Sequence, residues 1–135
     1  MLRSDGVEQS KALSAYLDKQ TSQNIYQAMQ FTRILDERMI AAQRQGRISF
    51  YLACTGEEAA IVASTAALND NDMIMSQYRE QGALVYRGYS ADDFMNQLFS
   101  NRLEPNKGRQ MPIHYGSKAH NFMTCLLYTS DAADD

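Results

Sequence analysis

The residues best suited to chemistry lie together near the middle of the chain, where Gln77, Tyr78 and Arg79 follow an apolar run at 73–75. Glu80 then opens a segment in which apolar residues resume. This order predicts a short buried strand, a polar turn and the first turn of a helix. In open α/β sheets, ligands bind at the carboxyl ends of strands, and a helix N-terminus there presents unpaired N–H groups to an anion. Arg79 adds a fork of donors and Tyr78 a hydroxyl, so we expect a corner that holds a diphosphate.

Each chemical interpretation competes with a simpler structural one. Arg79 can instead form a surface ion pair, for example with Glu80, and spacing alone favours that alternative. The adjacent acids Glu57 and Glu58 suit general acid–base work, but their place in the first turn of a helix favours capping and dipole stabilisation. Cys54 is expected to be a small packed residue rather than a nucleophile.

A long amphipathic helix is the clearest element ahead of this corner. From Ser22 to Gly46 apolar residues recur at roughly helical spacing, and the expected inward positions are Ile25, Met29, Ile34, Leu35, Met39, Ile40 and Ala42. Thr21 or Ser22 can cap the start of this helix, and Gly46 can stop it. Charged side chains are expected on its flanks, namely Asp36, Glu37, Arg38 and Arg44.

Shorter helices surround the corner on both sides. Thr55 and Glu58 form a capping-box pattern ahead of a helix that ends at the turn 69–72. Another helix begins at Glu80 and is closed by Arg87-Gly88-Tyr89, and Ser90 caps the one after it. These elements leave room for a single convincing strand, the apolar run before Gln77.

The remainder of the chain is predicted to be a loop rich in glycine, proline and basic groups, at 104–116. Its basic side chains can steer an anionic ligand, contact a second subunit or be solvated loop charges; they are Lys107, Arg109 and His114. The order helix, helix, strand, helix, helix indicates an α/β fold that is mostly helical here. Because a doubly wound sheet needs several strands, we expect the front of a larger domain.

Composition limits the class of protein. The chain of 135 residues is 44% hydrophobic and 21% charged, which suits one globular domain. Its net charge of -3 argues against nucleic acid as the main partner. No apolar run is long enough to span a bilayer, and the first residues lack the pattern of a signal peptide or a mitochondrial presequence. Two cysteines make no disulfide framework, and two histidines are too few for a metal cluster.

Four phrases in register resemble the alpha subunits of branched-chain 2-oxo acid (2-oxoisovalerate) dehydrogenases: RQGRISFY at 44–51, TGEEA at 55–59, QYRE at 77–80 and GRQMPIHYG at 108–116. These subunits belong to the thiamine-diphosphate decarboxylating component of their complex. The resemblance runs from about Ile25 to Thr124. Pyruvate dehydrogenase alpha subunits share the Tyr-Arg pair but lack the phrases around Phe50 and His114, so a pyruvate or other 2-oxo acid dehydrogenase is the alternative. A bacterial, cytoplasmic member is expected, or one of the mitochondrial matrix if the source is eukaryotic.

The resemblance implies a site that two subunits share. Tyr78 and Arg79 would hold thiamine diphosphate, Gln77 would stand close to it, and Phe50 would line the pocket for the branched acyl chain. The implied reaction is the oxidative decarboxylation of branched-chain 2-oxo acids, with transfer of the acyl group to a lipoyl group on the transacylase core. Magnesium would accompany the diphosphate and potassium is possible. A beta subunit would complete each site in a tetramer of two alpha and two beta chains.

The end of the chain departs from that family. After Thr124 the family continues with a Ser-Ser-Pro-Leu potassium loop, a Gly-Asp-Gly magnesium motif and a catalytic histidine, whereas residues 125–135 resemble a translated sequencing adapter. We therefore expect an arm at 1–20, a truncated cofactor-binding domain at 21–124 and a non-native tail at 125–135. Such a chain would hold no catalytic residue and no metal ligand, and would be inactive by itself. The alternative of another class is a small helical interaction module without catalysis, and neither nucleic acid nor a membrane is expected as a partner.

Overall fold

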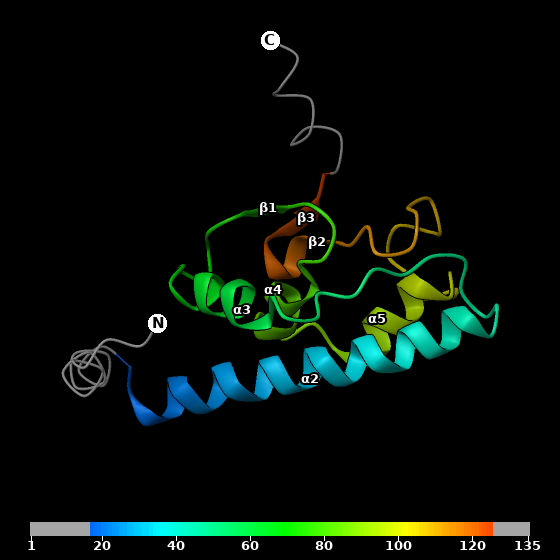
Figure 1. Ribbon diagram of the computed structural model, residues 1–135. Helices are drawn as coiled ribbons and strands as arrows, with labels where there is room; N and C mark the ends of the chain where they lie inside the picture. Colours follow the sequence, from blue (N-terminus) through cyan, green and yellow to red (C-terminus); the bar gives the residue numbers. More distant parts are fainter. Residues whose placement is uncertain (1–16, 126–135) are drawn as a thin grey trace, which may run out of the picture.

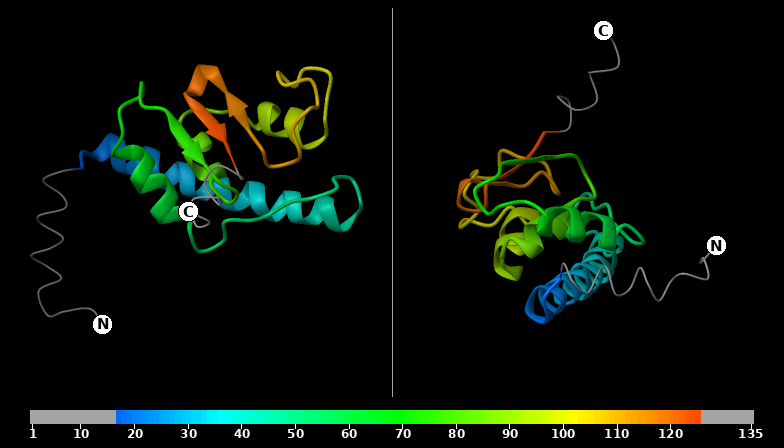
Figure 2. Two further views of the ribbon diagram at one scale, coloured as in Figure 1. Left: turned by 90° about the horizontal axis from the view of Figure 1, so that it is seen from above. Right: turned by 90° about the vertical axis from the view of Figure 1, so that its left-hand side faces the viewer.

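The computed structural model describes residues 17–125, so most of the expected N-terminal arm and nearly all of the expected tail lie outside the described residues. The described chain stacks in three layers, with a long helix at the base, short helices above it and a small sheet on top (Figure 1). The end-on view in Figure 2 shows the same order. The elements in chain order are α2 (Lys19–Arg44), α3 (Glu58–Ala66), β1 (Ile74–Ser76), α4 (Gln81–Tyr86), α5 (Ala91–Leu98), β2 (Gly116–Ser117), the 3-10 helix η1 (Lys118–His120) and β3 (Phe122–Thr124).

Helix α2 begins earlier than the sequence pattern predicts. Its N-cap is Asp18, whose Oδ1 accepts a hydrogen bond from the Thr21 N–H at 2.6 Å. This bond lowers the pKa of Asp18, because it favours the charged carboxylate. The prediction of Thr21 or Ser22 as the cap is therefore wrong, since both lie inside the first turn. At the other end Gly46 takes a φ of +71°, a left-handed conformation that ends the helix as predicted.

The buried face of α2 differs from the predicted face, most clearly at positions 34 and 36. Leu35 and Met39 point into the core as expected. Ile34, expected inside, is 56% exposed, whereas Asp36, expected on a flank, is only 2% exposed. The buried positions are 28, 32, 35, 36 and 39, a stripe from which position 34 is rotated away. Within residues 17–125, no helix is both long enough and apolar enough to cross a membrane.

Local hydrogen bonds define the starts of α5 and α3 in different ways. Ser90 caps α5 as predicted, because its Oγ accepts from the Asp93 N–H at 3.1 Å while the Asp93 carboxylate accepts from the Ser90 N–H. The capping box predicted for Thr55 and Glu58 is wrong, since α3 has no side-chain cap. Glu58 Oε2 instead accepts from the N–H of Gly56 at 2.7 Å, in the turn that leads into the helix.

Helix α4 is short and sits tightly between α2 and α3. Gly82 makes this approach possible, because a Cβ placed on it would lie 3.3 Å from Cγ2 of both Ile61 and Val62. The same Cβ would lie 3.4 Å from Thr32 Oγ1 on α2. The helix ends at Tyr86, and Gly88, two residues later, has a φ of +89° that confirms the predicted stop.

The sheet has three strands in the order β1-β3-β2, with β1 parallel and β2 antiparallel to β3. The predicted strand β1 is confirmed, although Met75 is 55% exposed and the strand is therefore not buried on both faces. Strands β2 and β3 are missed by the sequence prediction, which extends no strand beyond β1. Each has only two or three residues, too few to show an alternating pattern. The fold is a mixture of helices with a small mixed sheet.

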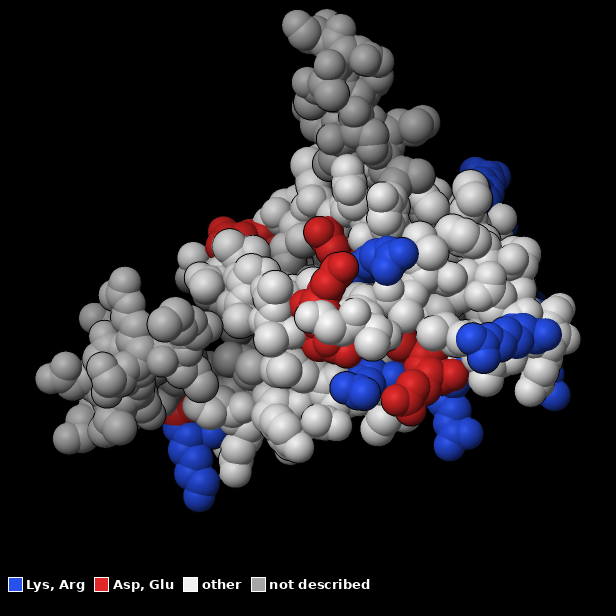
Figure 3. Space-filling model, viewed as in Figure 1, with Lys and Arg blue, Asp and Glu red and all other residues white. Residues whose placement is uncertain are grey.

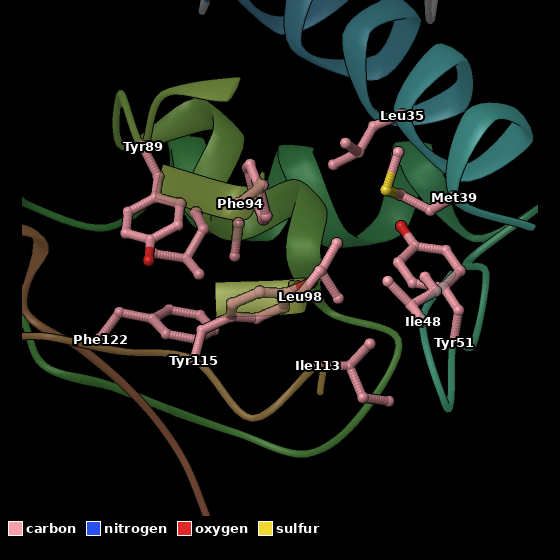
Figure 4. Packing of buried hydrophobic residues seen from close by; sticks show 12 residues of the cluster. Leu35, Met39, Ile48, Tyr51, Tyr89, Phe94, Leu98, Ile113, Tyr115 and Phe122 are labelled. Atoms are coloured by element: carbon pink, nitrogen blue, oxygen red, sulfur yellow. The ribbon is translucent and has the colours of Figure 1, made fainter. Parts of the chain in front are cut away.

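Aromatic rings fill the space between α5 and the strands (Figure 4). Phe94 meets Tyr89 edge-on with ring centroids 4.8 Å apart, and meets Tyr115 in the same way at 5.1 Å. Phe122 of β3 and Ile113 of the loop 104–116 join the same core. Burial of Ile113 and Tyr115 anchors that loop against the helices.

Candidate functional site

The polar turn 77–79 follows β1 at the edge where two parallel strands end together. Ser76 is the register partner of Thr124 on β3, and their hydroxyl oxygens are 3.3 Å apart. The N–H of Cys125 donates to the Ser76 carbonyl at 2.8 Å. The structure therefore places Gln77 and its neighbours at the carboxyl ends of β1 and β3, where α/β sheets bind ligands.

Arg79 is held in an unusual backbone conformation at this edge. Its φ is +68°, in the left-handed region where non-glycine residues are uncommon and strained. Its side chain is exposed, and Nη1 donates to the carbonyl of Ala53 at 3.2 Å. The alternative of an ion pair with Glu80 is not realised, because Glu80 Oε2 accepts the N–H of Gln77 at 3.0 Å and no ion pair between Glu80 and Arg79 is found among the described residues. The bond between the Gln77 N–H and the Glu80 carboxylate closes the turn, and the Arg79 guanidinium points to the Ala53 carbonyl instead.

The segment 47–54 lies against this turn and carries the predicted substrate residue. Phe50 is half-buried against the hydrophobic core. Hydrogen bonds join the segment to the turn and to the start of α4. Arg79 donates to the Ala53 carbonyl, and Gln81 Nε2 donates to the Leu52 carbonyl at 3.1 Å and to Tyr51 Oη at 3.5 Å. The structure thus brings the segment of Phe50 to the segment of Arg79, although they are distant in sequence.

Asp36 is a residue of this region that sequence reasoning missed. Its Oδ1 accepts from Tyr51 Oη at 2.6 Å and from Gln81 Nε2 at 2.7 Å. Its Oδ2 accepts from the Cys54 N–H at 2.8 Å and from Cys54 Sγ at 3.3 Å. One signal was available in the sequence. Asp36 stands four residues after Thr32, directly after Leu35 and three residues before Met39, which is helical spacing on the inward stripe.

The chemistry of the buried groups around Asp36 is that of neutral hydrogen-bond donors. Burial, and then the nearby Asp36 carboxylate, raise the pKa of the Cys54 thiol well above its usual range. Burial likewise raises the pKa of Tyr51. A thiol held in its protonated form is a poor nucleophile, so the prediction that Cys54 is a packed residue is confirmed.

The remaining candidates do not converge on a second site. Glu57 is exposed, whereas Glu58 is buried, with Oε2 bound to the Gly56 N–H and Oε1 without a hydrogen-bond partner among residues 17–125. Lys107 and Arg109 are exposed in the loop 104–116. On the face shown in Figure 3, acidic and basic side chains are interspersed rather than gathered by sign.

The donors at the corner fit a diphosphate. Arg79 donates from Nη1 to the Ala53 carbonyl, and within residues 17–125 no hydrogen bond from its Nε or Nη2 is found, while Tyr78 is 42% exposed. These groups donate hydrogen bonds to oxygen and do not ligate cations. Residues 17–125 contain no group of three His, Cys, Asp or Glu residues placed to hold a metal ion. The described residues thus suit the anionic part of a cofactor, and a metal would need ligands from elsewhere.

Comparison with known proteins matches residues 26–127 to the family model described as dehydrogenase E1 component. The chain belongs to the dehydrogenase E1 component family. All the corner residues lie within the matched part: Phe50, Gln77, Tyr78 and Arg79. The predicted resemblance is confirmed.

Several relatives of this E1 component segment carry the name 2-oxoisovalerate dehydrogenase subunit alpha, mitochondrial. The protein of Caenorhabditis elegans is 47% identical over 114 residues, which is 84% of this chain and 26% of that protein. The alpha 1 protein of Arabidopsis thaliana is 50% identical over 100 residues, 74% of this chain and 21% of its own length. The human protein is 44% identical over 109 residues, which is 81% of this chain and 24% of that protein. The chain thus spans about a quarter of the length of these relatives, and the expected bacterial cytoplasmic location stays a prediction.

Proposed function

We propose that this chain supplies the diphosphate-binding corner of an alpha subunit that takes part in the oxidative decarboxylation of branched-chain 2-oxo acids. The acyl group passes to a lipoyl group on the transacylase core. The observation that carries this proposal is Arg79, strained in a left-handed conformation beside the carboxyl ends of two parallel strands. The names of the relatives support the substrate class.

Within the proposed site, each corner residue has a separate task. Arg79 binds phosphate oxygens through its charged fork, and Tyr78 adds a hydroxyl donor. Gln77 stands beside the cofactor, next to the turn that Glu80 closes. When bound, thiamine diphosphate supplies the electron sink that decarboxylation of a 2-oxo acid requires. Magnesium, and possible potassium, take their ligands from parts of the full-length subunit other than residues 17–125.

Phe50 is proposed to select the substrate. Its half-buried ring presents an apolar wall on the segment that Arg79 and Gln81 hold in place. An apolar wall suits the branched side chain of 2-oxoisovalerate. The parallel pair of β1 and β3 is proposed to be the start of a doubly wound sheet that the rest of the subunit extends. A beta subunit completes the site in a tetramer of two alpha and two beta chains.

The test is cofactor titration of the full-length alpha subunit that carries this sequence, assembled with its beta subunit. Arg79→Ala should weaken binding of thiamine diphosphate in the presence of magnesium about ten- to a hundredfold, since a charge-assisted bond to phosphate is lost. Arg33→Ala is the matched control, because Arg33 forms an exposed ion pair with Glu37 on α2 and should leave the affinity unchanged. Unchanged affinity in Arg79→Ala would remove this residue from the site.

The same preparation separates the alternative substrates. Turnover of 2-oxoisovalerate in clear preference to pyruvate supports the branched-chain assignment, and the reverse preference would assign the chain to a pyruvate dehydrogenase. A wild-type assembly that binds no thiamine diphosphate would support the non-catalytic interaction module instead.

A further inference from the structure

We propose that Asp36 is a positioning residue that orients Arg79 through a single peptide group; this inference rests on the proposed function. The peptide group between Ala53 and Cys54 has one partner on each side. Its N–H donates to Asp36 Oδ2 at 2.8 Å, and its C=O accepts from Arg79 Nη1 at 3.2 Å. Asp36 lies inside the core and Arg79 at the surface, so the peptide group connects the two.

The geometry of a peptide group makes this connection rigid. A trans peptide is planar, and its N–H and C=O point to opposite sides. Nothing in the described chain is in the cis form. When the buried carboxylate fixes the direction of the Cys54 N–H, it also fixes the direction of the Ala53 carbonyl. Hydrogen bonds to both ends of one amide also polarise each other, which strengthens both.

A second contact ties Asp36 to the other side of the Arg79 turn. Gln81 follows Arg79 by two residues and is the first residue of α4. Its Nε2 donates to Asp36 Oδ1 at 2.7 Å and to the Leu52 carbonyl at 3.1 Å. The carboxylate therefore holds both the carbonyl that Arg79 binds and the chain that presents Arg79.

The cost of burying this group argues for a role beyond packing. Asp36 is 2% exposed and has no ion-pair partner among the described residues. A buried carboxylate without a counter-charge is expensive, and an apolar side chain serves helix packing better. Among the described residues, its side-chain hydrogen bonds come from the Tyr51–Cys54 segment and from Gln81, the parts that frame the corner. The arrangement fits a residue kept for geometry.

The experiment is a double-mutant cycle on the full-length alpha subunit assembled with its beta subunit. Thiamine diphosphate with magnesium is titrated against the wild type, Asp36→Asn, Arg79→Ala and the double variant. Asn at 36 keeps the shape but removes the charge and turns one acceptor into a donor. We expect Asp36→Asn to weaken binding about three- to tenfold in the wild-type background. It should have no further effect in the Arg79→Ala background, because the effect passes through Arg79.

Two outcomes overturn the inference and one overturns the proposed function. Unchanged affinity in Asp36→Asn, or an equal loss in both backgrounds, shows that Asp36 does not act through Arg79. Unchanged affinity in Arg79→Ala shows instead that the corner is not the diphosphate site. Leu35→Ala, next to Asp36 in the same core, is the matched control for lost stability and should change cofactor affinity by less than about twofold.

A second variant applies if Asp36→Asn does not assemble. Gln81→Leu removes the amide that bonds both Asp36 and Leu52, and leaves the carboxylate on the Cys54 N–H. It should weaken binding about two- to threefold in the wild-type background and not at all in the Arg79→Ala background. Affinity equal to that of the wild type would refute the positioning role.

Discussion

Ser76 and Thr124 are register partners on the parallel strands β1 and β3, with hydroxyl oxygens 3.3 Å apart although the residues are 48 positions apart in sequence. This pairing brings two strand ends to one edge of the sheet. The polar turn with Arg79 follows the carboxyl end of β1, and the chain after Thr124 follows the carboxyl end of β3 beside it. In a longer subunit, the segment that follows Thr124 would thus start beside the proposed diphosphate corner, where further ligands are needed.

The strain at Arg79 predicts a difference between two substitutions. Both Arg79→Gly and Arg79→Ala remove the guanidinium, so both should lose cofactor affinity. Glycine adopts a φ of +68° without strain, whereas alanine does not. Urea denaturation of the full-length subunit should give a free energy of unfolding about 0.5–1 kcal/mol higher for the glycine variant. If the alanine variant is instead more stable than the glycine variant, residue 79 must leave the left-handed conformation in that variant.

Gly82 is predicted to resist enlargement. Alanine favours a helix over glycine by about 1 kcal/mol, but its Cβ would press on Ile61 and Val62 at 3.3 Å. Because both neighbours are β-branched and held in α3, we expect Gly82→Ala to lower the free energy of unfolding by about 1–2 kcal/mol. Thermal unfolding checks the sign. Ala83→Gly is the companion variant, since it should lose about 1 kcal/mol of helix propensity and also the packing of one buried methyl group.

The buried tyrosines predict a loss of stability at alkaline pH. Burial, and then the charge of Asp93, raise the pKa of Tyr89 from 10.0 to about 12, and burial also raises the pKa of Tyr115. The folded state therefore favours the protonated phenol. The stabilisation is complete below about pH 10 and decreases as the pH rises toward about 12. Tyrosinate absorbance should rise together with unfolding, and Tyr89→Phe should shift this transition to higher pH. Ionisation of these tyrosines near pH 10 while the chain remains folded would contradict the prediction.

Phe50 is predicted to affect the substrate and not the cofactor. Phe50→Ala removes the apolar wall, so KM for 2-oxoisovalerate should rise about ten- to a hundredfold. Affinity for thiamine diphosphate should stay near that of the wild type, because Arg79 and its Ala53 contact are retained. Steady-state kinetics and calorimetry on the same preparation distinguish the two effects. Equal losses in both would indicate that the whole segment has moved.

Local sequence signals predicted the elements that depend on near neighbours. The cap at Ser90, the stops at Gly46 and Gly88, and the strand before Gln77 all follow from residues within a few positions. Strand β3 escaped prediction because it has only three residues and gains its order by pairing with β1. The cap of α2 was misplaced because Asp18, Thr21 and Ser22 are all good cap residues, and only the backbone path decides among them.

The sequence by itself determined the family, the long helix and the presence of an arginine where a strand meets a helix. Tertiary structure alone decided that Asp36 is buried and that Arg79 binds Ala53 rather than Glu80. The contacts that matter at the corner join residues 18, 26 and 45 positions apart. Hydrogen bonds of that range form only after α2, the segment 47–54 and α4 have packed together, so no local pattern of residues encodes them.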